Sequence, residues 1–332
     1  MQQDILTSAE VAKFISEGKT LLLAGDEALL GQLPKGKWIG GTIPYFISPE
    51  QGGMVSKDKI FVTDISAMAS KVEIQAYDQN QLGQVYCDGG ESGFSFIIIP
   101  AMSEVHSTFA INAPNYKDFG ARPLIGWISG VHLDDLGKIS PKVVNGESGE
   151  VLEKAAIVMH VTLPPGKVID VGIVNIFEQS AGDTLTFPDD GFSCTDVNVN
   201  GVKENFAAYI ERNKLDTKLP LVADYYGALV NISFQNVDQN TGEVAFYAPV
   251  FSGVRYKHAK AVEDYASAFT TQLQKIGLSD ESVVFSCNCI LNYLYSGLEG
   301  KSTAPFVGPI TFGEIAYQLL NQTLVYLQVY DS

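Results

Sequence analysis

Basic residues are scarce in this sequence, and their scarcity excludes two classes of partner. The 332 residues include 22 Lys and Arg against 38 Asp and Glu, which gives a formal net charge of −16. A protein that binds nucleic acid needs a basic stripe to displace counterions from phosphates. Anionic membrane surfaces attract basic segments for the same reason. The composition therefore predicts that neither nucleic acid nor a membrane is a partner.

Long hydrophobic runs and cysteines are also few. The longest apolar stretch, residues 94–102, contains Ser95 and Pro100 and falls far short of the ~20 residues of a membrane helix. The first residues lack the basic and apolar regions of a secretory signal. The cysteines are too few and too unevenly placed for a disulfide framework: Cys87, Cys194, Cys287 and Cys289. We therefore expect a cytoplasmic protein.

Apolar residues, by contrast, are plentiful. They make up 46% of the chain, enough for a large core, and the length favours two domains. Thr7 and Glu10 form a capping-box pattern that predicts a helix near the start. Apolar periodicity predicts another helix over residues 259–276, and alternating segments between these ends predict strands. The pattern indicates an α+β (mixed α/β) fold whose middle segments are rich in antiparallel strands.

The two chain ends follow the same order of elements. Each reads as helix, strand, short helix, an aromatic–aliphatic–Gly segment and a final strand, over residues 7–65 and 259–329. We expect two related αβ units around the strand-rich middle. An ancient duplication and the coincidence of a common arrangement both explain this order.

Several segments resemble the FIST family of sensory domains. The run Phe306–Ile315 (FVGPITFGEI), followed by Asn321-Gln322-Thr323, is similar to the end of the FIST C-terminal domain. Ser286-Cys287 resembles the Ser-Cys turn of that family, and residues 196–203 resemble its strand and Asn-Gly turn. Trp38–Thr42 resembles a strand end of the FIST N-terminal domain.

The resemblance implies a division into two domains and a sensory function. Residues 1–190 would form the FIST N-terminal-like domain and residues 191–332 the C-terminal-like domain. The family implies a cytosolic module that binds a small-molecule ligand and acts on a signalling protein such as a kinase, a chemoreceptor or a cyclic-dinucleotide enzyme. We expect this chain to lack an output domain of its own. An Arg common after the Ser-Cys pair is absent, unless Arg255 replaces it.

The segment around Cys287 and Asn288 is one candidate ligand site. It is predicted to join a strand to a helix, and a helix N-terminus can hold a carboxylate or a phosphate. The alternative interpretation is that Asn288 is an ordinary N-cap and that the cysteines are buried fillers.

The segment Gly308–Glu314 is the second candidate, and it is predicted to face Gly40, Gly41 and Thr42 across a cleft. Its glycines permit close backbone approach, and its Glu could bind an amine. In the alternative interpretation, Thr311 and Glu314 form the capping box of a helix through Leu320. The predicted ligand-binding residues are Gly40, Gly41, Thr42, Cys287, Asn288, Gly308, Thr311, Phe312, Gly313 and Glu314.

Two other functional classes remain open at this point. One is a hydrolase or transferase that uses Cys287, with His258 as its base, or Glu314. The other is a protein-interaction scaffold without a ligand. Some FIST relatives bind haem, for which the candidate axial ligands are His106, His132, His160 and His258. No attachment motif accompanies them, and the four cysteines lack the spacing of a zinc site. We therefore predict no cofactor, no metal and no catalytic residue.

Overall fold

A computed structural model describes residues 2–90, 92–225, 227–278 and 282–331 of the chain. Strands account for 42% of the residues and helices for 18%, and most strand pairs are antiparallel. The predicted mixed α+β class is therefore confirmed. The helices are short: α1 (Ser8–Ser16), α2 (Glu27–Leu30), α3 (Glu104–Asn112), α4 (Phe206–Asn213), α5 (Tyr265–Ile276), α6 (Ile290–Ser296), and the 3-10 helices Leu82–Gln84, Ala113–Asn115 and Leu133–Asp135.

The amino-terminal sheet has the strand order β1-β6-β2-β3-β10-β11. Its strands are β1 (Gln2–Leu6), β6 (Ile60–Asp64), β2 (Leu21–Gly25), β3 (Trp38–Thr42), β10 (Val143–Asn145) and β11 (Glu150–Leu152). Strands β2 and β3 are parallel, and α2 connects them. The predicted capping box of α1 is present. Val11 and Ile15 of α1 pack against the outer face of this sheet.

The middle sheet has the order β26-β25-β9-β8-β12-β7. Its strands are β26 (Gln318–Leu320), β25 (Glu314–Ala316), β9 (Leu124–Ser129), β8 (Gly93–Pro100), β12 (Ala156–Thr162) and β7 (Lys71–Tyr77). Strands β8 and β9 run parallel and are joined through α3. Because parallel neighbours end at the same edge, the residues after β8 and β9 lie together.

The carboxy-terminal sheet has the order β13-β27-β23-β24-β4-β5. Its strands are β13 (Lys167–Val174), β27 (Leu324–Asp331), β23 (Val283–Cys289), β24 (Gly308–Thr311), β4 (Tyr45–Ser48) and β5 (Gly52–Val55). Strands β23 and β24 are parallel, with α6 between them. Residues from both sides of the proposed 190/191 boundary share this sheet and the middle sheet, and the division into two domains stays a prediction.

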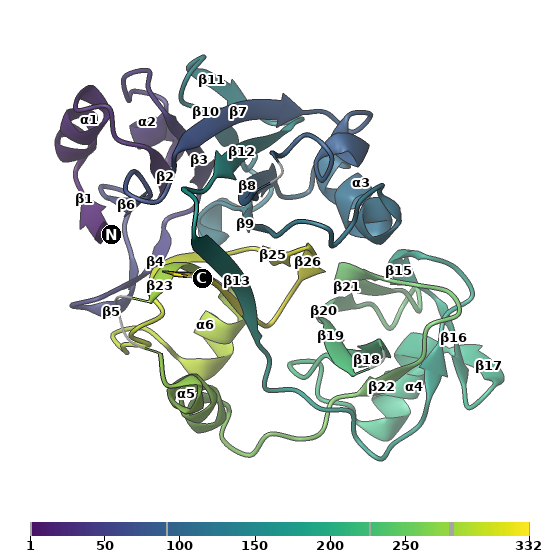
Figure 1. Cartoon of the computed structure of the whole chain (residues 1–332). Helices are drawn as coiled ribbons and strands as arrows, with labels where there is room; N and C mark the ends of the chain where they lie inside the picture. Colours follow the sequence, from purple (N-terminus) through teal and green to yellow (C-terminus); the bar gives the residue numbers. More distant parts are fainter. Residues whose placement is uncertain (1, 91, 226, 279–281, 332) are drawn as a thin grey trace.

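A smaller lobe extends from the three-sheet body, as Figure 1 shows. One lobe sheet has the order β17-β16-β14-β22-β18-β19, and a second has the order β15-β21-β20. The strands are β14 (Leu185–Thr186), β15 (Gly191–Cys194), β16 (Asp196–Val199), β17 (Val202–Asn205), β18 (Leu221–Tyr225), β19 (Ala228–Ile232), β20 (Phe234–Val237), β21 (Val244–Val250) and β22 (Tyr256–His258). Helix α4 packs in the same lobe (Figure 1).

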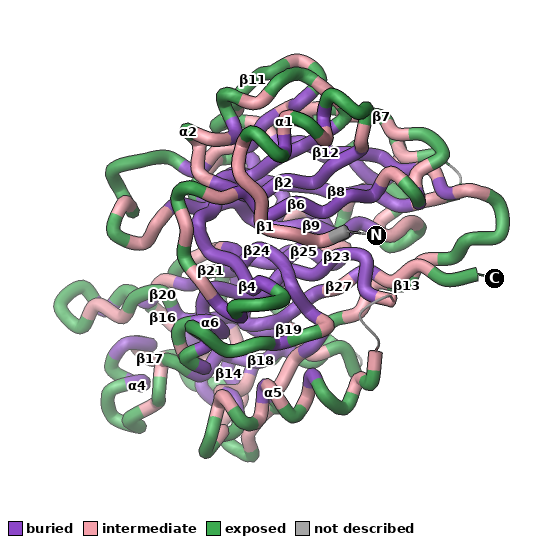
Figure 2. The backbone as a smooth tube through the Cα atoms, turned by 90° about the vertical axis from the view of Figure 1, so that its left-hand side faces the viewer, coloured by how far each residue is buried: buried purple, intermediate pink, exposed green. Residues whose placement is uncertain are grey.

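Two hydrophobic clusters join these parts. The larger cluster holds buried side chains of all three body sheets, and Figure 2 shows these buried strands stacked between exposed outer loops. The second cluster joins the other face of the middle sheet to the lobe, through residues such as Phe109 on α3 and Phe206 on α4. The lobe is therefore fixed to the body by apolar packing beside α3.

Two predicted helices differ in the structure. The helix expected over 259–276 begins only at Tyr265, after Asp264 caps it. The helix expected from Glu314 to Leu320 is instead the hairpin β25–β26, with Tyr317 at φ 63° in its turn. Strand β25 pairs with β9 in the middle sheet. Apolar residues spaced four apart fit a short helix and a hairpin equally well, and long-range pairing decided between them.

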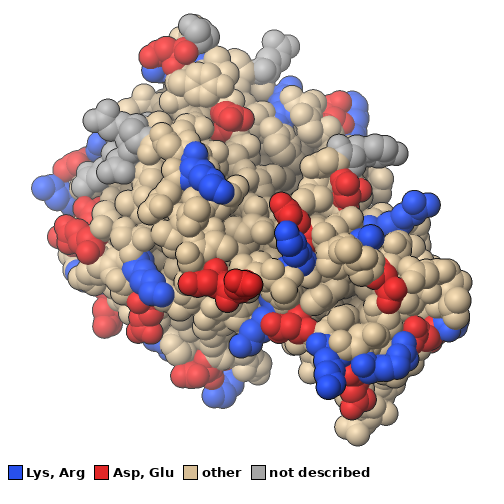
Figure 3. All heavy atoms as spheres, turned by 90° about the horizontal axis from the view of Figure 1, so that it is seen from below, with Lys and Arg blue, Asp and Glu red and all other residues tan. Residues whose placement is uncertain are grey.

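The surface carries charges of both signs. In Figure 3, which views the molecule from below, acidic and basic side chains are interspersed over the visible face. Among the described residues, the helices are all too short or too polar to cross a bilayer.

Candidate functional site

A pocket of about 260 Å³ lies where the body meets the lobe. The body contributes residues that directly follow β8, β23 and β24, and the lobe contributes residues of β20 and β21. In sheets with parallel strands, ligands bind in the crevice beyond the carboxyl ends of those strands. The position of this pocket is therefore typical of a ligand site.

The turn between β8 and α3 forms the floor of the pocket. Met102 holds a left-handed backbone at φ 59°, and Ser103 follows as the N-cap of α3. The Ser103 Oγ accepts a hydrogen bond from the backbone N–H of His106 at 3.1 Å. A positive φ is costly for Met, so it marks a strained turn at a cavity.

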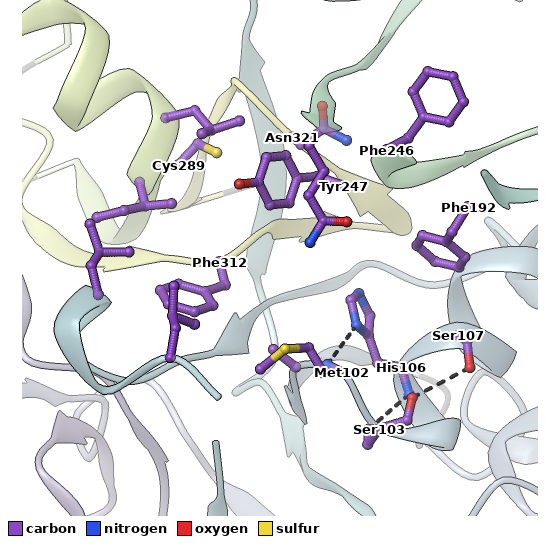
Figure 4. Close-up of a pocket in the computed structure, with 16 residues that line it drawn as sticks. Met102, Ser103, His106, Ser107, Phe192, Phe246, Tyr247, Cys289, Phe312 and Asn321 are labelled. Carbon is purple, nitrogen blue, oxygen red and sulfur yellow. Dashed lines mark hydrogen bonds between the residues drawn. The ribbon is translucent and has the colours of Figure 1, made fainter. Parts of the chain in front are cut away.

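His106 projects from the first turn of α3 into the pocket (Figure 4). Its Nδ1 accepts a hydrogen bond from the Met102 N–H at 3.3 Å, so the ring proton lies on Nε2. Burial lowers the pKa of His106 to about 4. The ring is therefore neutral at pH 7, and its Nε2–H has no partner among the described residues.

Asn321 supplies a second free donor from the segment after β26. The residue is 1% exposed, and its Oδ1 accepts a hydrogen bond from the backbone N–H of Ser233 at 2.9 Å. That bond fixes the amide orientation and leaves Nδ2 as a donor. Nδ2 is buried and has no partner among the described residues. Buried donors are nearly always satisfied in folded proteins, so an unsatisfied pair at a pocket is informative.

The walls of the pocket are aromatic and aliphatic. The lobe contributes Phe192, Phe246 and Tyr247, and Phe312 closes the body side (Figure 4). The Phe192 ring meets the His106 ring edge to face, with centroids 5.9 Å apart. None of the described residues that line the pocket is an Asp, Glu, Lys or Arg.

A buried acid stands behind one wall. Glu314 is fully buried on β25, and the Thr323 hydroxyl donates to its Oε2 at 2.8 Å. Burial raises the pKa of Glu314 to about 8, although the Thr323 hydrogen bonds oppose the change. The acid is therefore mostly protonated at pH 7. Its partner Cys289 lies on the pocket wall.

The thiols of this region are not activated. Burial, together with the adjacent Glu314, raises the pKa of Cys287 and of Cys289 well above the usual range. The Cys287 Sγ donates to the Gly126 carbonyl at 3.4 Å in the core. His258 lies in the lobe sheet, where its Nε2 bonds the Asp216 carbonyl at 3.0 Å. The structure thus places Cys287 and its proposed base in different sheets.

Asn288 is not the N-cap of α6, contrary to the sequence interpretation. It belongs to β23, where it pairs with Ile310 of β24 and with Leu324 of β27. Cys289 occupies the N-cap position without a capping side-chain hydrogen bond. The Asn288 Oδ1 instead accepts from the Asn292 amide at 2.9 Å. Pairing on both sides extends the strand beyond the point where local signals predict a turn.

The segment Gly308–Glu314 only partly lines the pocket. Gly308 and Thr311 belong to β24, and Phe312 alone of this segment reaches the pocket wall. A Cβ at Gly308 would lie 1.8 Å from the Ser286 carbonyl oxygen, so this glycine serves close strand packing. Thr311 donates to Glu314 in the core, and no capping box forms, because a hairpin replaces the helix.

Gly40, Gly41 and Thr42 all lie within β3. The Thr42 carbonyl accepts a hydrogen bond from the Gly130 N–H at 2.7 Å. Phe312 covers the other side of Gly130, where an added Cβ would lie 2.5 Å from its ring. The two predicted segments therefore approach the same turn, but Thr42 lines a different cavity, of about 390 Å³.

A family of unknown function, DUF6976, matches residues 6–330. The chain belongs to this family. No curated protein matches the sequence. Every residue that lines the pocket falls inside the matched range. Body and lobe are thus both parts of the DUF6976 fold.

Sequence reasoning missed most of the pocket of this DUF6976 protein. The sequence offers His106 only as a candidate haem ligand and Asn321 only as part of a family motif. One local signal was present, because Pro100 ends a long apolar run and Ser103 precedes Glu104 as a potential N-cap. The aromatic wall from the lobe left no such signal, since its residues meet the body only through tertiary packing.

Proposed function

We propose that this DUF6976 protein is a cytoplasmic sensory protein that binds a small molecule in the pocket between body and lobe. One observation carries the proposal. The pocket contains two buried donors, His106 Nε2–H and Asn321 Nδ2–H, that no described protein atom satisfies. Leaving a buried donor unsatisfied costs about 1–3 kcal/mol, and a bound ligand removes that cost.

The FIST resemblance supports the same function. Two of the segments that carry it contribute to the pocket, Phe312 from one and Asn321 from the other. A ligand between body and lobe would contact both parts, which gives it a means to alter their packing. We propose that a signalling protein, such as a kinase, a chemoreceptor or a cyclic-dinucleotide enzyme, responds to that change.

The two related units at the chain ends also belong to this proposal. In each, two parallel strands flank a short helix, and the final strand pairs antiparallel with the first: β2, β3 and β6 at one end, and β23, β24 and β27 at the other. This equivalence supports a common origin of the two units.

Native mass spectrometry of the purified full chain tests the binding function. Gln235 is an exposed residue of β20 on the pocket rim, so Gln235→Trp should fill the pocket without disturbing the core. Asn236→Trp is the matched control, because Asn236 is also exposed on β20 but is not among the residues that line the pocket.

We expect a co-purified small molecule on the wild-type chain and on Asn236→Trp, and its loss from Gln235→Trp. A wild-type chain without a bound molecule would contradict the proposal, and so would an adduct that survives Gln235→Trp. A stable complex with another protein in place of the adduct would favour the scaffold, and turnover of the molecule would favour an enzyme.

A further inference from the structure

The polar groups of the pocket define the chemistry of its ligand. On the basis of the proposed function, we infer that the ligand is an uncharged, planar molecule of one or two rings that carries a hydrogen-bond-accepting oxygen, such as a carboxamide. The inference rests on the free donors, on the aromatic walls and on the uncharged lining of the pocket.

His106 requires an acceptor from the ligand. Its Nδ1 is already occupied by the Met102 N–H, so the ring proton lies on Nε2, a buried atom of a pocket-lining residue that has no partner among the described residues. A ligand cation or a second N–H donor at this position would face that proton and repel it. An oxygen with a free lone pair matches it.

Asn321 also requires a hydrogen-bond acceptor from the ligand. Its Oδ1 is held by Ser233, and the free group is the amide N–H. Two donors on residues that line the same pocket match a carbonyl oxygen, which has two lone pairs, or two acceptors on one ring system. An amide ligand can also form a hydrogen bond with the polar side chain of Gln235 on the rim of the pocket.

The lining excludes a formal charge on the ligand. No described lining residue carries a charge, and an unpaired ion in an apolar site is strongly disfavoured. The rings of Phe192, Tyr247 and Phe312 instead offer flat surfaces for stacking. A cavity of about 260 Å³ limits the ligand to fragment size, because drug-sized ligands usually occupy ~300–1,000 Å³.

A series of four naphthalene probes tests the inference on the full chain. They are 2-naphthamide, 2-naphthoate, 2-naphthylmethylammonium and 2-methylnaphthalene, which share one ring system and differ in charge and acceptor. Their dissociation constants are measured by ligand-observed NMR on the wild type and on Gln235→Trp. We expect 2-naphthamide to bind at least ~10-fold tighter than each of the other three, and Gln235→Trp to abolish its binding.

One variant, with a matched control, tests the His106 donor directly. His106→Asn keeps an acceptor for the Met102 N–H but removes the donor at Nε2, and His258→Asn is the same substitution in the lobe sheet. We expect His106→Asn to weaken the binding of 2-naphthamide about 5- to 10-fold and to leave the affinity for 2-methylnaphthalene unchanged. His258→Asn should change neither affinity.

Each other outcome overturns the inference. If a charged probe binds as tightly as 2-naphthamide and Gln235→Trp blocks it, the ligand class is wrong while the binding function stands. If 2-naphthamide does not bind the pocket, the ligand class is wrong, and native mass spectrometry decides separately whether the pocket binds anything. Equal loss in His106→Asn and His258→Asn would refute the role of the Nε2 donor.

Discussion

Two histidines of the middle-sheet region, the buried His160 and the half-buried His106, differ in how their ring nitrogens are satisfied. His160, on β12, has a hydrogen-bonding partner at each nitrogen: Ser95 Oγ at 2.7 Å on Nδ1 and the Tyr77 hydroxyl at 2.8 Å on Nε2. His106 has a protein partner on Nδ1 alone. Burial lowers the pKa of both rings. The two therefore share a neutral charge state and differ in what they leave free.

The His160 network forms a chain in which each donor finds an acceptor. The Tyr77 hydroxyl donates to Asp88 Oδ2 at 2.9 Å, so it accepts from His160 Nε2–H, and His160 Nδ1 in turn accepts from Ser95. Such a chain resembles a nucleophile relay. However, Ser95 is buried and its hydroxyl is used within the protein. A polar chain in which every group is satisfied stabilises the fold, whereas a partly satisfied group such as His106 leaves a donor that a ligand can bind.

The largest effect on stability is expected at Gly308, where the packed interior leaves no space for a side chain. Gly308→Ala places a Cβ against the Ser286 backbone, so β23 and β24 must separate, at a cost of about 3–5 kcal/mol in the free energy of unfolding. Gly313→Ala is the control, because its Cβ would lie 3.1 Å from the flexible side chains of Ile128 and Leu319. Denaturant titration measures both, and equal losses would contradict the distinction.

The next contrast compares the two histidines. His160→Phe leaves the Ser95 hydroxyl without its partner in the interior and should lower the free energy of unfolding by about 2–4 kcal/mol. His106→Phe removes a donor that is already unsatisfied and the acceptor of the Met102 N–H. Because Met102 is exposed, water can replace that acceptor, so stability should change by less than ~1 kcal/mol while tight binding of 2-naphthamide is abolished. A greater loss of stability in His106→Phe than in His160→Phe would reverse the roles assigned to them.

Glu314 is predicted to make the free energy of unfolding depend on pH. Its pKa in the folded state is raised to about 8, so its contribution is present below the unfolded pKa and is lost as pH rises through 8. Burial lowers the pKa values of His106, His160 and His258, so their contributions change only below pH ~6.5. Between pH 6.5 and 8 the wild type should lose about 1–2 kcal/mol, and Glu314→Gln should not. Identical slopes for the two proteins, measured by denaturant titration at each pH, would refute the assignment.

Local signals in the sequence predicted the elements that local interactions decide. The Thr7–Glu10 capping box, the strand-rich middle and the mixed α+β class were all recoverable from short patterns. The hairpin at Glu314–Leu320 was not, because its apolar spacing also fits a helix and its partner β9 lies almost 200 residues earlier in the sequence. Only tertiary pairing resolves that ambiguity.

The candidate site was less predictable, for a related reason. Phe312 was the one predicted residue that reaches the pocket wall, whereas Gly308, Thr311 and Glu314 serve the packing behind it. Whether a donor such as Asn321 Nδ2 is satisfied depends on which residues surround it in three dimensions. No residue spacing along the chain contains that information.

The smallest expected effect concerns the thiol at the pocket wall, where we predict no change. Cys289 lies on the pocket but is 1% exposed, and burial together with Glu314 raises the pKa of its thiol. A thiol reacts as its thiolate, so at pH 7 Cys289 and Cys287 should be labelled much more slowly than the less buried Cys87. Cys289→Ser should leave the affinity for 2-naphthamide unchanged, because the sulfur supplies no required donor. Mass spectrometry of the labelled peptides gives the relative rates. Rapid labelling of Cys289, combined with turnover of a bound molecule that Cys289→Ser abolishes, would contradict this prediction. The pocket would then be a catalytic site and not only a binding site.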